Sequence, residues 1–147
     1  MTGKSSFDWR DFLKLAEELI DDCDKSRLDE AIKRTAISRA YYGVFNLTKQ
    51  LAINYLYFHA EKSAEDHKRL RDFFYNYANA IKENISDSDY KQLVVFLNYL
   101  EDLRRWRNEC DYDETVKNLD AKLQNALKKS HFILNVLDKF KEFSKHS

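Results

Sequence analysis

Three arginines, an asparagine, an aspartate and a tyrosine lie close together in one short segment of this chain. The segment from Leu103 to Tyr112 reads LRRWRNECDY. The planar guanidinium of Arg can grip phosphate oxygens with two parallel hydrogen bonds, whereas Lys offers a single point charge. These are the residue types that a phosphate-binding site would use, with a neighbouring polar group to handle a proton.

Charged residues replace apolar ones on one face of this segment. Steps of three and four residues define a single helical stripe: Leu93, Leu97, Leu100, Arg104, Arg107 and Asp111. Charges that face a core are costly unless they are paired or hydrogen-bonded, so we expect a polar cluster at one end of a helical bundle. Two interpretations stay open. One is a structural ion pair of Arg107 with Asp111 or a solvated helix end, and the other is a functional site.

An earlier helical segment carries a second irregularity, the run SRAYYGVF from Ser38 to Phe45. A glycine inside a helix costs about 1 kcal/mol relative to Ala, so we expect Gly43 to permit the close approach of another helix. Tyr41 and Tyr42 point about 100° apart on a helix. We expect one of them to pack in the core while its hydroxyl reaches a polar partner.

The elements that must position these residues are helices. Proline is absent and there are only two glycines, which argues against the tight turns of β-structure. A length of 147 residues and a hydrophobic fraction of 44% suit one domain with a full core. We therefore predict an all-α, five-helix, up-and-down bundle that occupies residues 1–147 as a single domain.

Hydrophobic periodicity gives approximate bounds for these five helices. We expect them at Phe7–Asp22, at Leu28–His59, from an N-cap at Ser63, from Ser86 or Asp87 to near Cys110, and from an N-cap at Asp113 or Thr115. The acidic residues Asp21, Asp22 and Asp24 mark the end of the first helix.

Overall charge and cysteine content exclude several classes of protein. The 25 basic and 25 acidic residues balance, so any contact with nucleic acid must come from a local patch. Cys23 and Cys110 are too few for a disulfide framework, and we expect reduced thiols. The first six residues lack the apolar core of a signal peptide, and no stretch is long and apolar enough for a membrane span. We expect a cytoplasmic protein that does not enter a membrane.

Few residues in the sequence support a metal site or a nucleophilic active site. The four histidines do not pair with another His or Cys at metal-ligand spacing, so no metal site is expected. The sequence has no glycine-rich phosphate loop and no serine nucleophile elbow. Glu109 and Asp111 flank Cys110 and should raise its pKa, which disfavours a catalytic thiolate. No cofactor is expected.

Three of these features together resemble the HEPN superfamily of prokaryotic helical-bundle proteins. Ser38 to Phe45 is similar to the family's Ser-Arg-x-Tyr-Tyr signature, and Leu103 to Tyr112 is similar to its Arg-rich segment ending in Asp-Tyr. His67 falls where many relatives carry a His at the start of the third helix. The order and spacing of the three elements agree with the family over most of the chain.

The resemblance implies a homodimer whose paired motifs form a metal-independent endoribonuclease site. In the family, that motif is an Arg, then a polar residue, then a His about a turn and a half later. Arg107 and Asn108 match the first two positions, but Tyr112 stands where the His would fall, with Asp111 and Asp113 on either side. Family members often act as toxins beside a nucleotidyltransferase antitoxin.

Two functional hypotheses follow from the resemblance. The first is an RNA-directed protein, either a weak ribonuclease or the toxin-like half of a two-gene module. The second is a non-catalytic module that binds nucleotide or RNA or docks a partner. In both, the expected site has Arg107, Asn108, Asp111 and Tyr112 at its centre and Arg39, Tyr42, His67 and Arg104 as supporting binding residues.

Overall fold

A computed structural model describes residues 7–21 and 28–145 of this chain. Five α-helices account for most of these residues: α1 (Arg10–Asp21), α2 (Asp29–Tyr55), α3 (Asp66–Ile81), α4 (Asp87–Tyr112) and α5 (Leu119–Lys145), with a short 3-10 turn, η1 (Lys82–Asn84), between α3 and α4. No strand occurs in this part of the chain. The predicted all-α, five-helix fold is confirmed. The expectations for Asp22, Cys23 and Asp24 lie outside the described residues.

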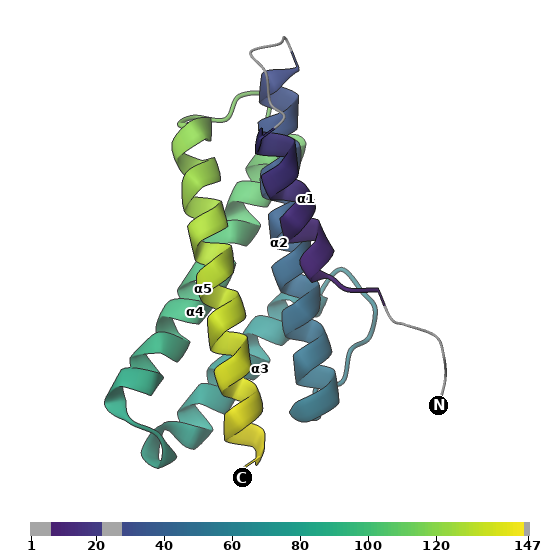
Figure 1. Ribbon diagram of the computed structural model, residues 1–147. Helices are drawn as coiled ribbons and strands as arrows, with labels where there is room; N and C mark the ends of the chain where they lie inside the picture. Colours follow the sequence, from purple (N-terminus) through teal and green to yellow (C-terminus); the bar gives the residue numbers. More distant parts are fainter. Residues whose placement is uncertain (1–6, 22–27, 146–147) are drawn as a thin grey trace.

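Helix α2 is the centre of the bundle. It packs against α1, α4 and α5, while α3 packs mainly on α4. In Figure 1, α1 and α4 run upward and α2 and α5 run downward, whereas α3 slants across the lower half. The chain therefore alternates direction through its four long-axis helices, and the start of α3 comes from a connection that follows the lower end of α2.

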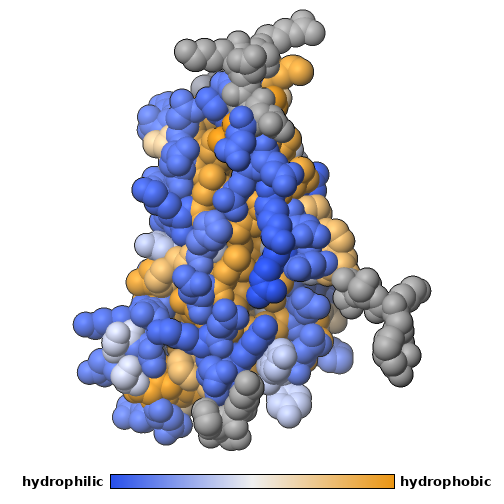
Figure 2. All heavy atoms as spheres, in the orientation of Figure 1, coloured by the Kyte–Doolittle hydropathy of each residue, from blue (hydrophilic) through white to orange (hydrophobic). Residues whose placement is uncertain are grey.

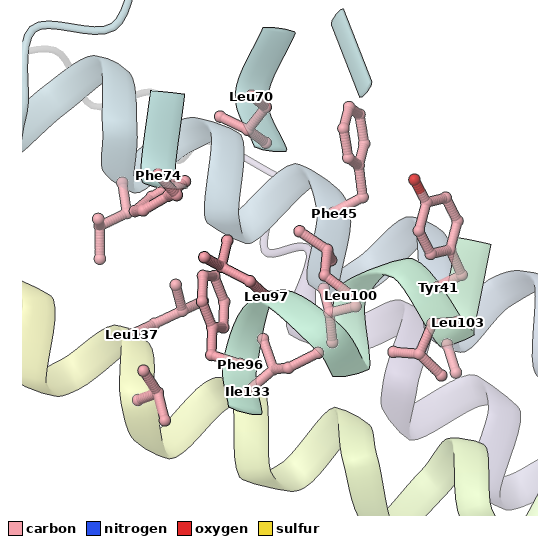
Figure 3. Close-up of a cluster of buried hydrophobic side chains, with 14 of the residues drawn as sticks. Tyr41, Phe45, Leu70, Phe74, Phe96, Leu97, Leu100, Leu103, Ile133 and Leu137 are labelled. Carbon is pink, nitrogen blue, oxygen red and sulfur yellow. The ribbon is translucent and has the colours of Figure 1, made fainter. Parts of the chain in front are cut away.

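Aromatic rings from three helices fill the middle of the core. Phe74 of α3, Phe96 of α4 and Phe140 of α5 are all fully buried, and their ring centroids lie 4.8–5.4 Å apart in tilted, edge-to-face arrangements. Edge-to-face contacts stabilise such clusters beyond the burial of apolar area. Figure 3 shows this cluster continuing past Leu100 and Leu103 to Tyr41, whose hydroxyl points away from both leucines.

Gly43 permits the close packing of α1 on α2, as its position in the helix predicts. A Cβ at residue 43 would lie 2.9 Å from the Trp9 carbonyl oxygen and 3.2 Å from the Phe12 Cβ. The first of these contacts is to backbone, which cannot move aside as a flexible side chain would. A glycine is therefore required for α1 to lie this close to α2.

One of the predicted helix starts is confirmed. The Ser86 hydroxyl accepts a hydrogen bond from the Asp89 N–H at 3.0 Å and caps α4. The prediction for α3 was wrong, because Ser63 forms a separate turn in which its hydroxyl accepts the Glu65 N–H at 3.3 Å, and the helix starts at Asp66. The α2 helix also ends earlier than expected, at Tyr55, since Tyr57 adopts a left-handed conformation with φ 64°.

The start of α5 was also predicted wrongly. Neither Asp113 nor Thr115 caps it, since the helix begins at Leu119 after Asn118, whose φ is 56°. Arg34 of α2 explains the longer connection. Its guanidinium donates hydrogen bonds to the carbonyl oxygens of Asp113 at 2.6 Å and Glu114 at 2.9 Å, which diverts these backbone groups from a helix.

Hydrophilic side chains cover most of the face seen in Figure 2, interrupted by a narrow apolar strip along the long axis of the molecule. Mixed surfaces of this kind are ordinary for globular domains. None of the helices in the described ranges has the length and apolar character required to cross a membrane.

Candidate functional site

Arg107 of α4 points into the bundle between two tyrosines of α2. Only 7% of the residue is exposed, and its guanidinium carbon lies 5.3 Å from the ring centre of Tyr41 and 5.1 Å from that of Tyr42. A cation over an aromatic face is attracted by the ring quadrupole, and more strongly where water is excluded. The inward turn of charge that the helical stripe predicted is therefore present, and both tyrosines help to accommodate it.

Asp111 lies one turn further along α4 and partly balances this buried charge. Its Oδ2 is 3.8 Å from the Arg107 Nη1, too far for a good hydrogen bond, and it accepts a bond from the Ser38 hydroxyl at 3.3 Å. The Asp111 side chain is 28% exposed and the Arg107 side chain 9%. The ion pair that one interpretation of the sequence expected is present, but it is loose.

His67 meets Tyr41 where the start of α3 approaches α2. The Tyr41 hydroxyl and the His67 Nδ1 are in hydrogen-bond contact. The imidazole stacks on the Phe45 ring, with centroids 3.9 Å apart and planes 15° apart. Tyr41 is the buried tyrosine whose hydroxyl finds a polar partner, as predicted for one of the adjacent pair. Since Tyr41 also contacts Arg107, this ring connects the imidazole to the buried cation.

The surroundings of His67 disfavour its protonation. Burial lowers the pKa of His67, and the positive charges of Arg104 and Arg107 lower it further, to about 4 from the ordinary 6.5. Lys49 acts in the same direction, while Asp66 opposes it. The imidazole is therefore neutral at neutral pH. Burial raises the pKa of Tyr41, so its hydroxyl stays protonated.

Arg104 lies next to this group on the same helix and is half-buried. The Nε of Arg104 and the Nε of Arg107 are both shielded from solvent, and neither has a hydrogen-bond partner among the described residues. A buried donor without a partner costs about 1–3 kcal/mol, and more when it is charged. Both Nε atoms are out of reach of a ligand, so an anion would be bound by the other guanidinium nitrogens of the half-buried Arg104.

Asp66 secures the start of α3, next to His67. The residue is 2% exposed, its Oδ2 lies 2.9 Å from the Lys49 Nζ, and its Oδ1 accepts a bond from the Arg69 Nη1 at 3.0 Å. Burial would raise the pKa of Asp66, but these bonds and one from the Glu61 N–H outweigh it and lower the pKa to about 2. Asp66 therefore fixes the turn from which His67 projects.

The other predicted residues lie around this centre. Asn108 and Tyr112 are exposed on a flank of α4, where they line a shallow hollow together with Arg104. Tyr112 is 77% exposed. The Arg39 guanidinium carbon lies 5.3 Å from the centre of the Phe12 ring, away from the tyrosines that contact Arg107. Arg39 contributes to another open hollow, which it shares with Ser38, Asp111 and four further residues.

Sequence reasoning left Tyr41, Ser38 and Lys49 out of the predicted site. The sequence contains a pattern that could have indicated them. Residues 38, 41, 42, 45 and 49 recur at three- and four-residue steps and share one face of α2. Of these residues, only one of the two adjacent tyrosines was expected to pack in the core. The structure shows that its polar members meet the charged end of α4 and the start of α3.

Two further points concern groups of possible metal ligands and the thiol of Cys110. In residues 7–21 and 28–145, no three His, Cys, Asp or Glu side chains group as a metal-binding set. Cys110 is buried, and burial raises the pKa of its thiol to about 11, with smaller contributions from Asp111 and Glu109. The predicted direction was right, although burial is the larger cause.

Comparisons with known proteins report a relative from an archaeon. The chain is similar to an uncharacterized protein of Methanocaldococcus jannaschii, with 28% identity over an alignment that covers 92% of this chain and 89% of that protein. No family model matches the sequence. No solved structure matches it either. The similarity spans nearly the whole of both chains, so it is not confined to the arginine-rich segment.

Proposed function

We propose that this protein is a HEPN-type helical bundle that binds RNA through its phosphate groups. The observation that carries the proposal is the half-buried guanidinium of Arg104, which lies on α4 one turn before the buried positive charge of Arg107. A phosphate oxygen is the acceptor that a guanidinium matches best in charge and shape. The half-buried Arg104 would make the direct contact, while the buried Arg107 would strengthen the local positive potential.

Single-stranded RNA suits the surroundings of this site better than a long duplex. The net charge of zero provides no broad basic surface along which a duplex could lie. Tyr112 presents an exposed ring on the same flank as Arg104, and aromatic rings bind unpaired bases by stacking. The amide of Asn108, between them on α4, offers both a donor and an acceptor to a base edge.

The test is a binding measurement by fluorescence anisotropy with a labelled 12-nucleotide single-stranded RNA of mixed sequence. We expect Arg104→Ala to weaken binding at least tenfold, because it removes the accessible guanidinium. Lys128→Ala is the matched control, since it removes an exposed cation from α5 and should leave affinity unchanged. Equal losses in the two variants, or no binding by the unmodified protein, would contradict the proposal.

The HEPN resemblance extends the proposal to assembly. On that basis alone we infer a homodimer, and a role as the toxin-like half of a module with a nucleotidyltransferase. Light scattering after size-exclusion chromatography would measure the mass of the assembly, with twice the 17.6 kDa chain mass expected. A monomer at micromolar concentration would overturn the dimer without affecting RNA binding, which is measured separately.

A further inference from the structure

We propose that the hollow lined by Arg104, Asn108 and Tyr112 binds the 3′-terminal nucleotide of an RNA strand rather than an internal nucleotide. This inference rests on the RNA binding proposed above and names the part of the strand that the site takes. The hollow has a volume of about 730 Å³, which lies within the range of sites for small ligands. Its lining residues are Glu101, Arg104, Arg105, Asn108, Glu109, Tyr112 and Asp113.

Ion pairs already engage three of the charged side chains in this hollow. The pairs are Glu101 with Arg71, Glu109 with Lys122 and Arg105 with Asp102, at N–O distances of 2.9, 2.6 and 2.9 Å. A ligand would have to displace a partner of opposite charge before it could use any of these three side chains. They therefore form a largely neutralised rim.

Two other charged side chains of the hollow are free. The Arg104 guanidinium and the Asp113 carboxylate form no ion pair or hydrogen bond with another described residue. Arg104 lies on α4, and Asp113 is the residue that directly follows this helix. Their separation along the chain corresponds to a rise of about 13 Å on a helix. The hollow therefore has a free positive charge toward one end and a free negative charge at the other.

Asn108 and Tyr112 lie between these two charges, at four-residue steps from Arg104 along one face of α4. Helical side chains lean toward the N-terminus of their helix, which directs the exposed Tyr112 ring back toward the turn that carries Asn108. The ring offers a stacking surface for a base, and the amide offers a donor and an acceptor to its edge. A single base therefore fits the middle of the hollow.

This order of groups matches a nucleotide that has a phosphate on the 5′ side of its ribose and free hydroxyls at the 2′ and 3′ positions. Arg104 would bind the phosphate and Tyr112 would stack on the base. Asp113 would accept hydrogen bonds from the ribose hydroxyls, as carboxylates do in dinucleotide sites. An internal nucleotide carries a second phosphate on its 3′ side, which the free carboxylate of Asp113 would repel.

A strand end and a free nucleoside 5′-monophosphate share this chemistry, and charge favours the strand end. The phosphodiester before a terminal nucleotide carries one negative charge, whereas a phosphate monoester carries about −1.5 to −2 at neutral pH. Arg104 supplies one free positive charge, and the free carboxylate of Asp113 makes a second negative charge on the ligand unfavourable.

The test uses fluorescence anisotropy with a single-stranded RNA of mixed sequence, labelled at its 5′ end and prepared with different 3′ ends. We expect a 3′-phosphate to weaken binding by at least about tenfold relative to a 3′-hydroxyl, because like charges would then meet at Asp113. A 2′-O-methyl group on the last ribose should weaken binding by about fivefold, since an ether oxygen cannot donate to a carboxylate.

Protein variants assign these effects to particular residues. Asp113→Asn removes the repelling charge, so we expect the penalty for a 3′-phosphate to fall below about threefold. Binding of the 3′-phosphate RNA by this variant also shows that it is folded. Asp138→Asn, which removes an exposed carboxylate from α5, is the matched control and should keep the full penalty. Arg104→Ala should weaken the 3′-hydroxyl and 3′-phosphate forms by the same factor, because the phosphate it contacts is common to both.

Three results would overturn recognition of the 3′ end and leave RNA binding in place. They are equal affinity of the unmodified protein for the 3′-hydroxyl and 3′-phosphate forms, an unchanged penalty in Asp113→Asn, and displacement of the RNA by free nucleoside 5′-monophosphates as effectively as by unlabelled RNA. The third would identify a free nucleotide as the ligand. Failure of the unmodified protein to bind any of the RNA forms would instead remove the function on which this inference rests.

Discussion

At the scale of single residues, Arg104 and Arg107 differ in how much of the guanidinium can reach a ligand. Arg107 is packed between Tyr41 and Tyr42 and is 7% exposed, whereas Arg104 is half-buried at the edge of the same group. Long cationic side chains contribute to folding through their packing as well as their charge. Changes at Arg107 therefore report on stability first, and changes at Arg104 report on binding.

We predict that Arg107→Ala lowers the free energy of unfolding by about 2 kcal/mol, because it removes a desolvated cation–π contact and leaves Asp111 without its ion pair. Urea unfolding followed by circular dichroism measures this loss. Arg105→Ala on the same helix is the control. The Arg105 side chain is 60% exposed in its ion pair with Asp102, so a change of no more than about 0.5 kcal/mol is expected. Equal effects would contradict the buried role of Arg107.

The pH dependence of stability should reveal His67. Burial and then the charges of Arg104 and Arg107 lower its pKa to about 4 in the folded chain, whereas the unfolded chain keeps the ordinary 6.5. As pH falls from 6.5 to 4, the unfolded state takes up a proton that the folded state does not, so stability decreases across that window. Above pH 6.5, His67 causes no loss in the free energy of unfolding.

We expect His67 to lower the free energy of unfolding by about 1.5 kcal/mol between pH 6.5 and pH 4. One pKa unit corresponds to about 1.4 kcal/mol, and the partial exposure of His67 reduces the effect of its full pKa shift. Urea unfolding at several pH values measures it. His67→Gln should flatten this part of the curve, and His59→Gln should not. The lowered pKa of Asp66, about 2 against the ordinary 3.8, adds a separate loss below pH 3.8. Unchanged curves in His67→Gln would refute the assignment.

At the scale of elements, the packing of α1 on α2 depends on a missing side chain. We predict that Gly43→Ala destabilises the protein by about 1 kcal/mol. The gain in helix propensity of about 1 kcal/mol is smaller than the cost of forcing a Cβ to within 2.9 Å of the Trp9 carbonyl oxygen. Urea unfolding in a Trp106→Phe background measures this change and leaves Trp9 as the fluorescent reporter of α1. Gln50→Ala, exposed on α2, is the control, and stabilisation by Gly43→Ala would contradict the close contact.

The connection between α4 and α5 depends on hydrogen bonds from Arg34. Its guanidinium donates to the carbonyl oxygens of Cys110, Asp113 and Glu114, at 3.3, 2.6 and 2.9 Å. We predict that Arg34→Lys speeds hydrogen exchange at residues 113–118, because an ammonium cannot reproduce this planar set of bonds. Mass spectrometry after deuterium labelling measures it, with exchange in α3 as the internal reference. Unchanged exchange at 113–118 would mean that the connection is held by other contacts.

At the scale of the whole molecule, charge is balanced and any affinity for RNA is local. The chain has 25 basic and 25 acidic residues. We predict that the logarithm of the RNA-binding constant falls with the logarithm of salt concentration with a slope of about −0.7, as expected for a contact to about one phosphate of a single strand. Anisotropy titrations from 50 to about 300 mM salt measure the slope. A value steeper than about −5 would indicate a broad basic interface that the charge balance does not provide.

Much of the fold followed from local patterns. The absence of proline and the 3.6-residue periodicity predicted five helices, and the start of α4 near Ser86 and the close approach at Gly43 were expected for local reasons. The helical stripe also predicted that Arg107 turns inward, because the direction of a side chain on a helix depends only on its position in the repeat. Arg104 and His67 were also named from the sequence as supporting residues of the same site. The side chains that each of them contacts were not predicted.

Tertiary structure decided the composition of the site. Whether His67 of α3 reaches Tyr41 of α2 depends on how the helices cross, which no period within one helix contains. The start of α5 likewise moved to Leu119 because Arg34, some 80 residues earlier, binds the backbone before it. The sequence by itself determined the helices and which of their faces turn inward, since both arise from interactions within a few residues. Only the packed bundle decided which polar residues on those faces meet, because their partners lie on other helices.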